Sequence, residues 1–461
     1  MSAVDGIKLQ AELNRPLVDK KTAASKKAVS IFFNPFVILA FSIDLLTPYL
    51  IWKGLLPTSV RWLSHGCLLA LVVWSYLRML SYNRVPAGAW VVGLGTVLWG
   101  IVALYQGQGL LAVFWGWLMM FQFSMVGLFA YLQPEWPRRF PYWLMVICIS
   151  ILVFEVLFQI VEYLTGMTPG DNLDGSFGFS GSGHLMITLI VIYCLAVGTW
   201  LANRNWIPLV AVLFLGTIAS LLGELKLFYV TSILILTVAL LISLYQDKRF
   251  WKIVPYGLLA IIVLYGFVKL YDAVVPGAKI APLESYITDP KVLNKYLNFT
   301  EKKVSEGKVY YNVGRNYALN YGWNSINRDN LVLLFGYGLG ARAESQTLGA
   351  AGTGIQQGRL GANAGSSLLV MMQELGVVGL TSVVLFLLWM IATLIREIRL
   401  HPKSEANALR YGVLLFTLFW PLWAWYNPAW TLRVPMMIYW IAAGYGLGYR
   451  YTLNQKIEDE Q

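Results

Sequence analysis

Apolar residues in this chain fall into blocks of about 20, and charged residues separate one block from the next. A helical block of that length matches the thickness of the hydrocarbon core of a bilayer. Only 13% of the residues are charged and the mean hydropathy is +0.60, whereas soluble domains carry about 25% charged residues. The pattern therefore excludes a soluble enzyme, a disordered regulator and a disulfide scaffold, and it predicts a multi-pass membrane protein.

We expect an all-α integral membrane protein, because backbone amides that face lipid must be paired within a helix. The sequence predicts about twelve transmembrane helices and one large loop, at residues 273–365, between the ninth and the tenth. Residues 1–30 and 451–461 are expected to be polar tails, residues 31–272 to hold nine helices and residues 366–450 to hold three. The predicted spans are 31–53, 62–82, 87–105, 109–132, 140–165, 183–202, 206–222, 227–246, 252–272, 368–395, 410–426 and 433–449.

The net charge of +11 comes mostly from basic residues in the tails and in the short linkers between spans. Twenty Lys and Arg residues lie on the side of the two tails, and only five lie in the short linkers of the opposite side. Under the positive-inside rule, this asymmetry predicts that both tails are cytoplasmic and that the 273–365 loop is external. The charge therefore indicates orientation, and it does not indicate a nucleic-acid partner.

The loop over 273–365 is far longer than an ordinary connection, which usually means that it carries function. Residues 290–330 are expected to be helical, and the stretch rich in Gly, Ala and Gln over 336–365 is expected to be a mobile loop. Two weak motifs lie here, Gly314-Arg315 and the Gly-x-Gly-x-Gly run that precedes Arg342. Arginines beside glycine-exposed backbone amides can bind a diphosphate.

Two further candidate sites lie at the external ends of predicted spans. Glu224 and Lys226 occur in a turn with almost no other charge, where the lysine can attract an anionic headgroup or can simply lie at the interface beside its glutamate. His184 enters the sixth span, where its imidazole can take up a proton at neutral pH or can cap the helix. Asp171 and Asp174 could hold a divalent cation together with His184, but the mobile glycines and the lack of further ligands favour no metal.

Ionisable residues inside the spans are functional candidates by default, because their burial in hydrocarbon is costly. Asp44 and Glu155 are expected to pair across helices or to accept hydroxyl hydrogen bonds, and His65 is expected to be structural. The cysteines are expected to be small buried residues of the spans: Cys67, Cys148 and Cys194.

The order of these motifs resembles that of the bacterial O-antigen ligase and O-antigen polymerase (Wzy-type) superfamily, over about the C-terminal 300 residues. The matching elements are the Gly/Phe/Ser loop over 175–184, the basic turn at Lys226, Gly314-Arg315, the run over 335–340 and a Leu-x-x-x-x-Glu-Leu-Gly-x-x-Gly-Leu pattern over 369–380. The resemblance implies a GT-C-like protein of the bacterial inner membrane whose active site faces the periplasm.

The resemblance also implies an inverting, metal-independent glycosyl transfer, without a cofactor, from an oligosaccharide carried on polyprenyl diphosphate. By this resemblance Lys226 and Arg315 would bind the diphosphate, with Arg342 as a further candidate. Aromatic residues of the loop would stack on sugar faces, although ordinary packing is an alternative for each: Tyr311, Tyr317, Trp323 and Tyr337.

The chain departs from the superfamily at one informative position. Ligases typically place His-Asn nine residues before the glutamate of the last motif, whereas Gly365 and Ser366 occupy those positions ahead of Glu374 here. The histidine that would activate the acceptor hydroxyl is therefore missing. Candidates for this base are His184, then Glu224 and Glu374, and a reaction without a general base is also open.

The leading prediction is a polymerase of exopolysaccharide, capsule or O-antigen repeats, with membrane lipids and a chain-length regulator as partners. A ligase that moves the glycan to lipid A core or protein shares the donor chemistry and is the first alternative. A transporter or flippase is the second, but the sequence lacks the inverted repeats that such proteins usually show.

Overall fold

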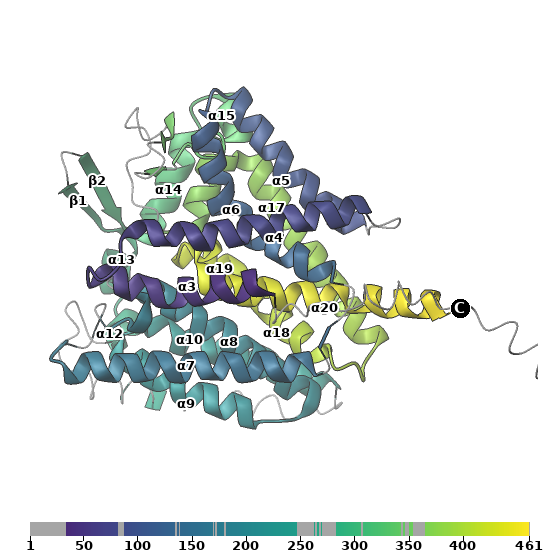
Figure 1. The fold of residues 1–461 in the computed structure, drawn as a ribbon. Coiled ribbons are helices and arrows are strands. Elements are labelled where there is room, and N and C mark those ends of the chain that lie inside the picture. Colours follow the sequence, from purple (N-terminus) through teal and green to yellow (C-terminus); the bar gives the residue numbers. More distant parts are fainter. Residues whose placement is uncertain are drawn as a thin grey trace, which may run out of the picture.

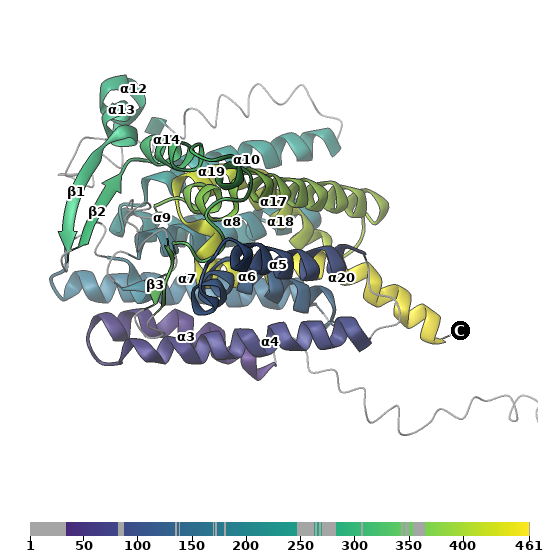
Figure 2. The ribbon, with the colours of Figure 1, turned by 90° about the horizontal axis from the view of Figure 1, so that it is seen from above.

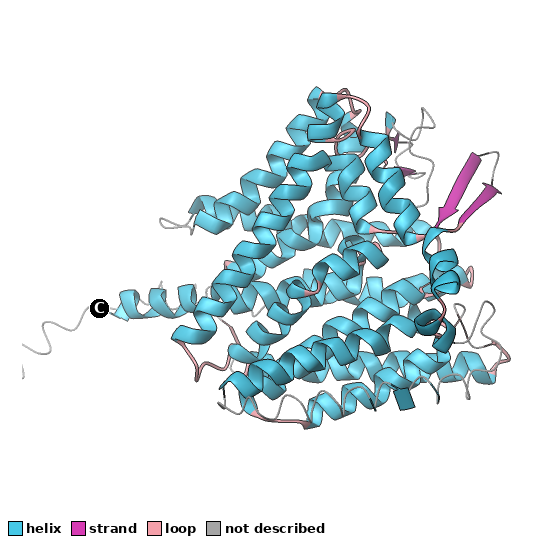
Figure 3. Ribbon diagram, turned by 180° about the vertical axis from the view of Figure 1, so that it is seen from behind, coloured by secondary structure: helices cyan, strands magenta, loops and turns pink. Residues whose placement is uncertain are grey.

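A computed structural model of the chain describes residues 34–81, 87–133, 136–137, 139–168, 170, 173–178, 181–246, 262, 265–266, 269, 283–305, 308–342, 344–345, 350–353 and 365–460. The helices run between two ends of one bundle (Figure 1). One end carries α12 (Leu283–Thr288), α13 (Pro290–Asn298) and α14 (Arg315–Ile326), and we call it the loop end. The C-terminal helix projects from the opposite end, which we call the tail end (Figures 2 and 3).

Eight helices are long and apolar enough to cross a membrane, and each confirms a predicted span. They are α3 (Pro35–Trp52), α4 (Arg61–Ser81), α5 (Ala87–Tyr105), α6 (Leu110–Tyr131), α7 (Phe140–Leu164), α8 (Ser182–Asn203), α10 (Lys226–Gln246) and α17 (Ser367–Leu400). The described structure is therefore that of an α-helical multi-pass membrane protein, and the total of twelve spans stays a prediction.

The remaining predicted spans differ from simple membrane helices. The span over 206–222 is the shorter apolar helix α9 (Ile207–Leu222), and the span over 252–272 lies almost entirely outside the described residues. The span over 410–426 is two helices, α18 (Asn407–Leu418) and α19 (Trp420–Tyr426), because Pro421 lacks the N–H that a continuous helix would need. The last predicted span is part of α20 (Arg433–Glu460), whose helix continues into the predicted tail.

The centre of the bundle is α8, which is buried along most of its length and packs against α9, α10, α18 and α20. Glycines allow its closest contact, because a Cβ at Gly198 would lie 2.4 Å from the Gly412 backbone nitrogen on α18. Large apolar side chains on α5, α7 and α17 are exposed, as is expected of surfaces that face lipid.

The loop end is not purely helical, which corrects the expectation of helix over 290–330. Strands β1 (Thr300–Ser305) and β2 (Lys308–Val313) form an antiparallel hairpin in which Thr300 lies opposite Val313. The β-branched and aromatic residues of 308–313 favour a strand over a helix. A second short hairpin joins β3 (Glu344–Ser345) to β4 (Ala350–Ala351), and α15 (Asn330–Phe335) precedes it.

Residues 336–342 also correct the expectation of a mobile loop over 336–365. Gly336 and residues 338–341 are buried, and the segment packs between α6 and residues 373–376 in the first third of α17. Residues 354–364 lie outside the described part of the chain.

Candidate functional site

Ionisable side chains from four helices meet near the loop end: Asp44 on α3, Arg61 and His65 on α4, His184 on α8 and Arg433 on α20. We call this group the arginine cluster. The Arg433 guanidinium donates to Asp44 Oδ1 at 2.7 Å, and the Ser64 hydroxyl donates to Asp44 Oδ2 at 2.7 Å. Asp44 thus pairs across helices, as the sequence predicts, and its carboxylate joins α3 to both α4 and α20.

His65 orients Arg433 from the other side. Its Nε2 lies 2.5 Å from Arg433 Nη2, and its Nδ1 lies 3.0 Å from the Gln122 side-chain oxygen on α6. A guanidinium can only donate, so Nε2 accepts and Nδ1 carries the proton that is donated to Gln122. His65 is therefore neutral in this arrangement, and its two contacts fix the position of the Arg433 side chain.

Arg61 is the second cation of the cluster, and its charge is stabilised at a distance by Asp44, the carboxylate that already pairs with Arg433. In the described part of the chain it forms neither a hydrogen bond nor an ion pair, and it lies half-buried where it interacts unfavourably with Arg433. The helices α4, α8 and α20 all begin here, at Arg61, Ser182 and Arg433. Helix starts carry free N–H groups and partial positive charge, so this location favours a bound anion.

His184 lies two residues after the start of α8, within reach of the electrostatic field of Arg433 and Arg61. Its ring stacks on Phe177, with centroids 5.7 Å apart and planes inclined by 23°. Neither of its ring nitrogens has a hydrogen-bond partner among the residues that the structure describes. The half-buried imidazole is therefore available to a ligand or to a proton.

A polar stripe on α7 holds the loop that precedes His184. Glu155 accepts hydrogen bonds from the Ser176 backbone N–H at 2.8 Å and from the Ser176 hydroxyl at 2.5 Å. One turn further on, the Gln159 amide donates to the Leu173 carbonyl at 2.6 Å. Residues 173–178 are consequently buried, and the predicted Gly/Phe/Ser loop serves to position the start of α8.

Arg315 approaches the same region through the last residue of α19. Its Nε donates to the Tyr426 carbonyl at 2.9 Å, and its guanidinium lies over the Tyr426 ring, 5.0 Å from the centroid. The next residue, Asn427, has its side-chain oxygen 3.5 Å from where a Cβ of Gly183 would be. The segment Tyr426–Asn427 therefore contacts both Arg315 and the residue before His184.

The glycine run before Arg342 is a packed turn whose polar groups bind the protein itself. Gly336, Gly338 and Gly340 have φ of 72°, 89° and 87°, which only glycine adopts readily. The Arg342 N–H donates to Glu374 Oε1 at 3.1 Å, and the Arg342 guanidinium donates to the Gln373 side-chain oxygen. Burial lowers the pKa of Arg342, and the nearby Glu374 opposes this shift. Arg342 and Glu374 already bond protein groups, whereas the described residues form no hydrogen bond with the His184 ring or the Arg61 guanidinium. His184 and Arg61 are therefore the better candidates to bind a ligand.

The turn between α5 and α6 holds the other side of this run. The Gln106 amide donates to the Gly336 carbonyl at 3.0 Å, and the Gln108 amide donates to the Tyr337 carbonyl at 2.6 Å. Deeper in the bundle, a Cβ at Gly116 on α6 would lie 2.4 Å from the Gly340 Cα. The loop after α15 is thus fixed to an N-terminal helix as well as to α17.

Glu224 and Lys226 form the turn between α9 and α10. Glu224 has a φ of 50°, and its carboxyl carbon lies 3.7 Å from where a Cβ of Gly170 would be. Lys226 is the first residue of α10, which packs on α8 and α9, whereas Arg315 begins α14, which packs on α13, α17 and α19. The two residues predicted to bind one diphosphate thus start helices in different parts of the bundle (Figure 1).

Aromatic side chains near these groups fall into two sets. On α14, Tyr317 is 38% exposed and Trp323 is 47% exposed, so both can meet a ligand. The Tyr337 hydroxyl instead donates to the Ser325 carbonyl at 2.7 Å, and the Tyr311 side chain lies outside the described residues. Beside the arginine cluster, Trp62, Trp115 and His65 form an aromatic group with centroids between 5.1 and 5.6 Å apart.

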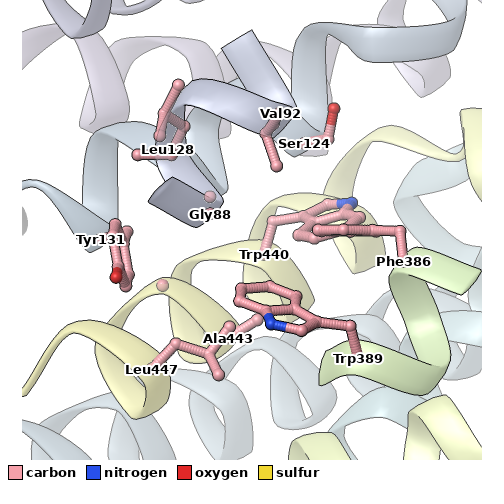
Figure 4. A pocket seen from close by; sticks show the side chains of 13 residues that line it. Gly88, Val92, Ser124, Leu128, Tyr131, Phe386, Trp389, Trp440, Ala443 and Leu447 are labelled. Carbon is pink, nitrogen blue, oxygen red and sulfur yellow. The ribbon is translucent and has the colours of Figure 1, made fainter. Parts of the chain in front are cut away.

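No group of three or more metal-ligating side chains occurs in the described ranges of the chain. A small cavity of about 40 Å³ lies between α5, α6, α17 and α20, walled by Trp389, Trp440 and Phe386 (Figure 4). It is apolar and too small for a sugar or a lipid headgroup, so it belongs to the packing of the bundle.

No protein-family model matches the chain, and no curated protein matches its sequence. The choice of the candidate site therefore rests on the geometry of the arginine cluster.

Arg61 and Arg433 are the site residues that sequence reasoning missed, since it treated both as linker residues. Two signals in the sequence point to them. They are cations on the side of the membrane that the charge distribution leaves poor in cations, and they adjoin spans that carry Asp44 and His65, which need partners.

Proposed function

We propose that this chain is an inverting, metal-independent glycosyltransferase of the bacterial inner membrane that polymerises polyprenyl-diphosphate-linked oligosaccharides into a surface polysaccharide. The observation that supports this function is the arginine cluster. Two guanidinium groups that share the single carboxylate of Asp44, together with three helix starts, lie beside a half-buried histidine whose ring nitrogens have no hydrogen-bond partner among the described residues. A diphosphate on a membrane lipid supplies the charge, the oxygen acceptors and the location that these groups require.

The proposed reaction uses these side chains directly. A hydroxyl of the acceptor sugar attacks the anomeric carbon of the donor, the bond from that carbon to the diphosphate oxygen breaks, and its electron pair leaves with the diphosphate. Arg61 and Arg433 stabilise the charge that develops on the leaving group. His184 takes the proton from the attacking hydroxyl, because no described residue bonds its ring nitrogens, whereas Glu374 already accepts the Arg342 amide.

The aromatic residues give the site a means to hold sugars on both sides of the reacting bond. Trp62 and Trp115 lie beside the cluster, and the exposed Tyr317 and Trp323 lie on the helix that Arg315 begins. We assign sugar stacking to these side chains and place Arg315 at the acceptor side, across Tyr426 from the cluster. In this proposal the site faces the periplasm.

The test is the substitution Arg61→Gln, read as glycan length on gels and as turnover of lipid-linked repeats by purified protein. A lost charge-assisted hydrogen bond is worth about 1.5–3 kcal/mol, so the rate should fall by about 10- to 150-fold. Lys53→Gln is the matched control, because Lys53 is an exposed cation of the same end that lies over Trp52, outside the cluster. Equal activity of the two variants would refute the proposal.

The same experiment separates the alternatives. A polymerase defect leaves single repeats on the carrier lipid, whereas a ligase defect leaves long polymer stranded on it. A flippase defect would instead leave the lipid-linked repeat on the cytoplasmic leaflet, and that result would move the chain to the transporter class.

A further inference from the structure

A groove of about 790 Å³ lies at the tail end of the bundle, between α8, α10, α17 and α18. This volume falls within the range of small-molecule sites, about 300–1,000 Å³. On α10 the lining residues recur at helical spacing, so one face of that helix forms a wall: Val238, Leu241, Ile242, Tyr245 and Gln246. Leu241 is 42% exposed and Tyr245 is 67% exposed, so the groove is open to the outer surface of the bundle.

The lining of the groove changes from apolar to polar toward the tail end. The residues that lie further into the bundle are apolar: Leu201, Val238, Leu241, Ile395 and Leu414. At the tail end the groove is lined by Arg204 at the end of α8, Gln246 at the end of α10 and Arg399 in the last turn of α17. The wall on α10 runs from Val238 to Gln246, or about 12 Å, which is less than the thickness of one leaflet of hydrocarbon, about 15 Å. The groove therefore has the polarity and the depth of one leaflet.

Two guanidinium groups give the tail end of the groove a positive charge. Arg204 Nη1 donates to the Ser243 hydroxyl on α10 at 2.5 Å, which holds this guanidinium beside the wall. Arg399 is exposed, and no hydrogen bond or ion pair joins it to another described residue. The neighbouring carboxylate of Glu397 is buried and pairs with Arg410 on α18 at 3.4 Å, and the described residues that line the groove include no acidic side chain. The two arginines are thus placed to bind phosphate oxygens.

An anionic phospholipid has the chemistry that this groove requires. Its acyl chain matches the apolar part, and its phosphate matches the arginines. Basic pockets between membrane helices on the cytoplasmic side bind anionic headgroups, and the charge distribution predicts that the tail end is cytoplasmic. A second copy of this chain would bring further cations to the same place, because Lys and Arg are concentrated on this side.

We propose that the groove between α8, α10, α17 and α18 binds one anionic phospholipid of the tail-end leaflet. Its phosphate lies at Arg204 and Arg399, and an acyl chain lies against Val238 and Leu241. The bound lipid fills the space between α10 and α17. This site is independent of the proposed function, since it lies at the opposite end of the bundle from the arginine cluster.

The test compares phosphatidylglycerol with phosphatidylethanolamine of the same acyl chains, with binding to the delipidated whole chain measured by native mass spectrometry. Arg399→Gln removes one charge from the groove. Arg396→Gln is its matched control, because Arg396 is an exposed arginine of α17 that does not line the groove. Leu241→Trp fills the apolar part, and Leu234→Trp is its control, because Leu234 is 43% exposed on the same helix and does not line the groove.

Each arginine near an anionic headgroup should favour phosphatidylglycerol by about 5-fold, so we expect a preference of about 25-fold in the unsubstituted protein and about 5-fold in Arg399→Gln. Leu241→Trp should weaken the binding of both lipids, whereas the two controls should bind them as the unsubstituted protein does.

Equal binding of the two lipids by the unsubstituted protein would overturn the inference, as would equal effects of each variant and its control. Tighter binding of polyprenyl phosphate than of phosphatidylglycerol would also overturn it. A dimer that Leu241→Trp dissociates and Leu234→Trp does not would assign the groove to a second copy of the chain instead.

Discussion

Gly376 is the position where α17 leaves its helical path, with φ 62° and ψ −164°. This region is accessible essentially only to glycine, so another residue there costs about 1–3 kcal/mol of backbone strain. A Cβ at Gly376 would also lie 2.3 Å from the Gly336 backbone nitrogen and 2.6 Å from the Leu334 carbonyl oxygen. Overpacking adds about 1–3 kcal/mol, so Gly376→Ala should lower the free energy of unfolding by about 2–6 kcal/mol.

The measurement is thermal unfolding of the purified protein in detergent. Gly95→Ala on α5 is the control, because apart from its chain neighbours and the backbone of its own helix no described atom lies within 4 Å of the added Cβ, and alanine favours a helix by up to about 1 kcal/mol. Gly376→Ala should therefore unfold several degrees below the control. Equal midpoints for the two variants would refute the view that this break in α17 exists to accommodate the turn at Gly336.

Three further predictions concern the loop end. Glu155→Ala removes both hydrogen bonds from Ser176 and should cost about 2–4 kcal/mol in thermal unfolding, with a smaller loss for Glu155→Gln; equal losses would show that the carboxylate charge is irrelevant. Arg315→Ala should reduce long glycans to single repeats on gels, because the proposal places Arg315 at the acceptor side, whereas Lys226→Ala should retain long chains, because Lys226 begins α10, away from the arginine cluster; single repeats from Lys226→Ala would instead assign the diphosphate to Lys226. His184→Ala should slow transfer by the purified enzyme, and full activity of this variant would remove His184 as the base. A chelator should leave the rate of the unsubstituted enzyme unchanged, and inhibition that added metal reverses would contradict a metal-independent reaction.

The sequence predicts the membrane helices well because hydrophobic length is a local property. Prediction from the sequence fails at a break inside an apolar block and at a hairpin in a segment that is expected to be helical. Pro421 ends α18 within one apolar block, and the hydropathy of that block does not reveal the break. The strand over 308–313 was expected to be helical, although its β-branched and aromatic residues and the Glu-Gly pair before it favour a hairpin.

The site was only partly predictable, because it depends on which helices meet. The place of Asp44 inside a span predicts that it needs a partner, but its partner Arg433 lies 389 residues away, and no local pattern gives that contact. His184 was recognised from its place at a helix start. In the sequence the glycines at 336, 338 and 340 indicate mobility, whereas in the structure they form a packed turn, since the same residue type serves both flexible segments and close-packed turns with positive φ.

The contacts of Gln106 and Gln108 with the turn at Gly336 and Tyr337 have a consequence for biosynthesis. Each glutamine bonds a carbonyl about 230 residues later in the chain. At 5–20 residues per second, a ribosome needs roughly 10–50 s to deliver that segment. The N-terminal helices must therefore persist in the membrane over this interval while the side-chain amides of Gln106 and Gln108 lack these carbonyl acceptors. A nascent chain released before residue 336 cannot form these two hydrogen bonds.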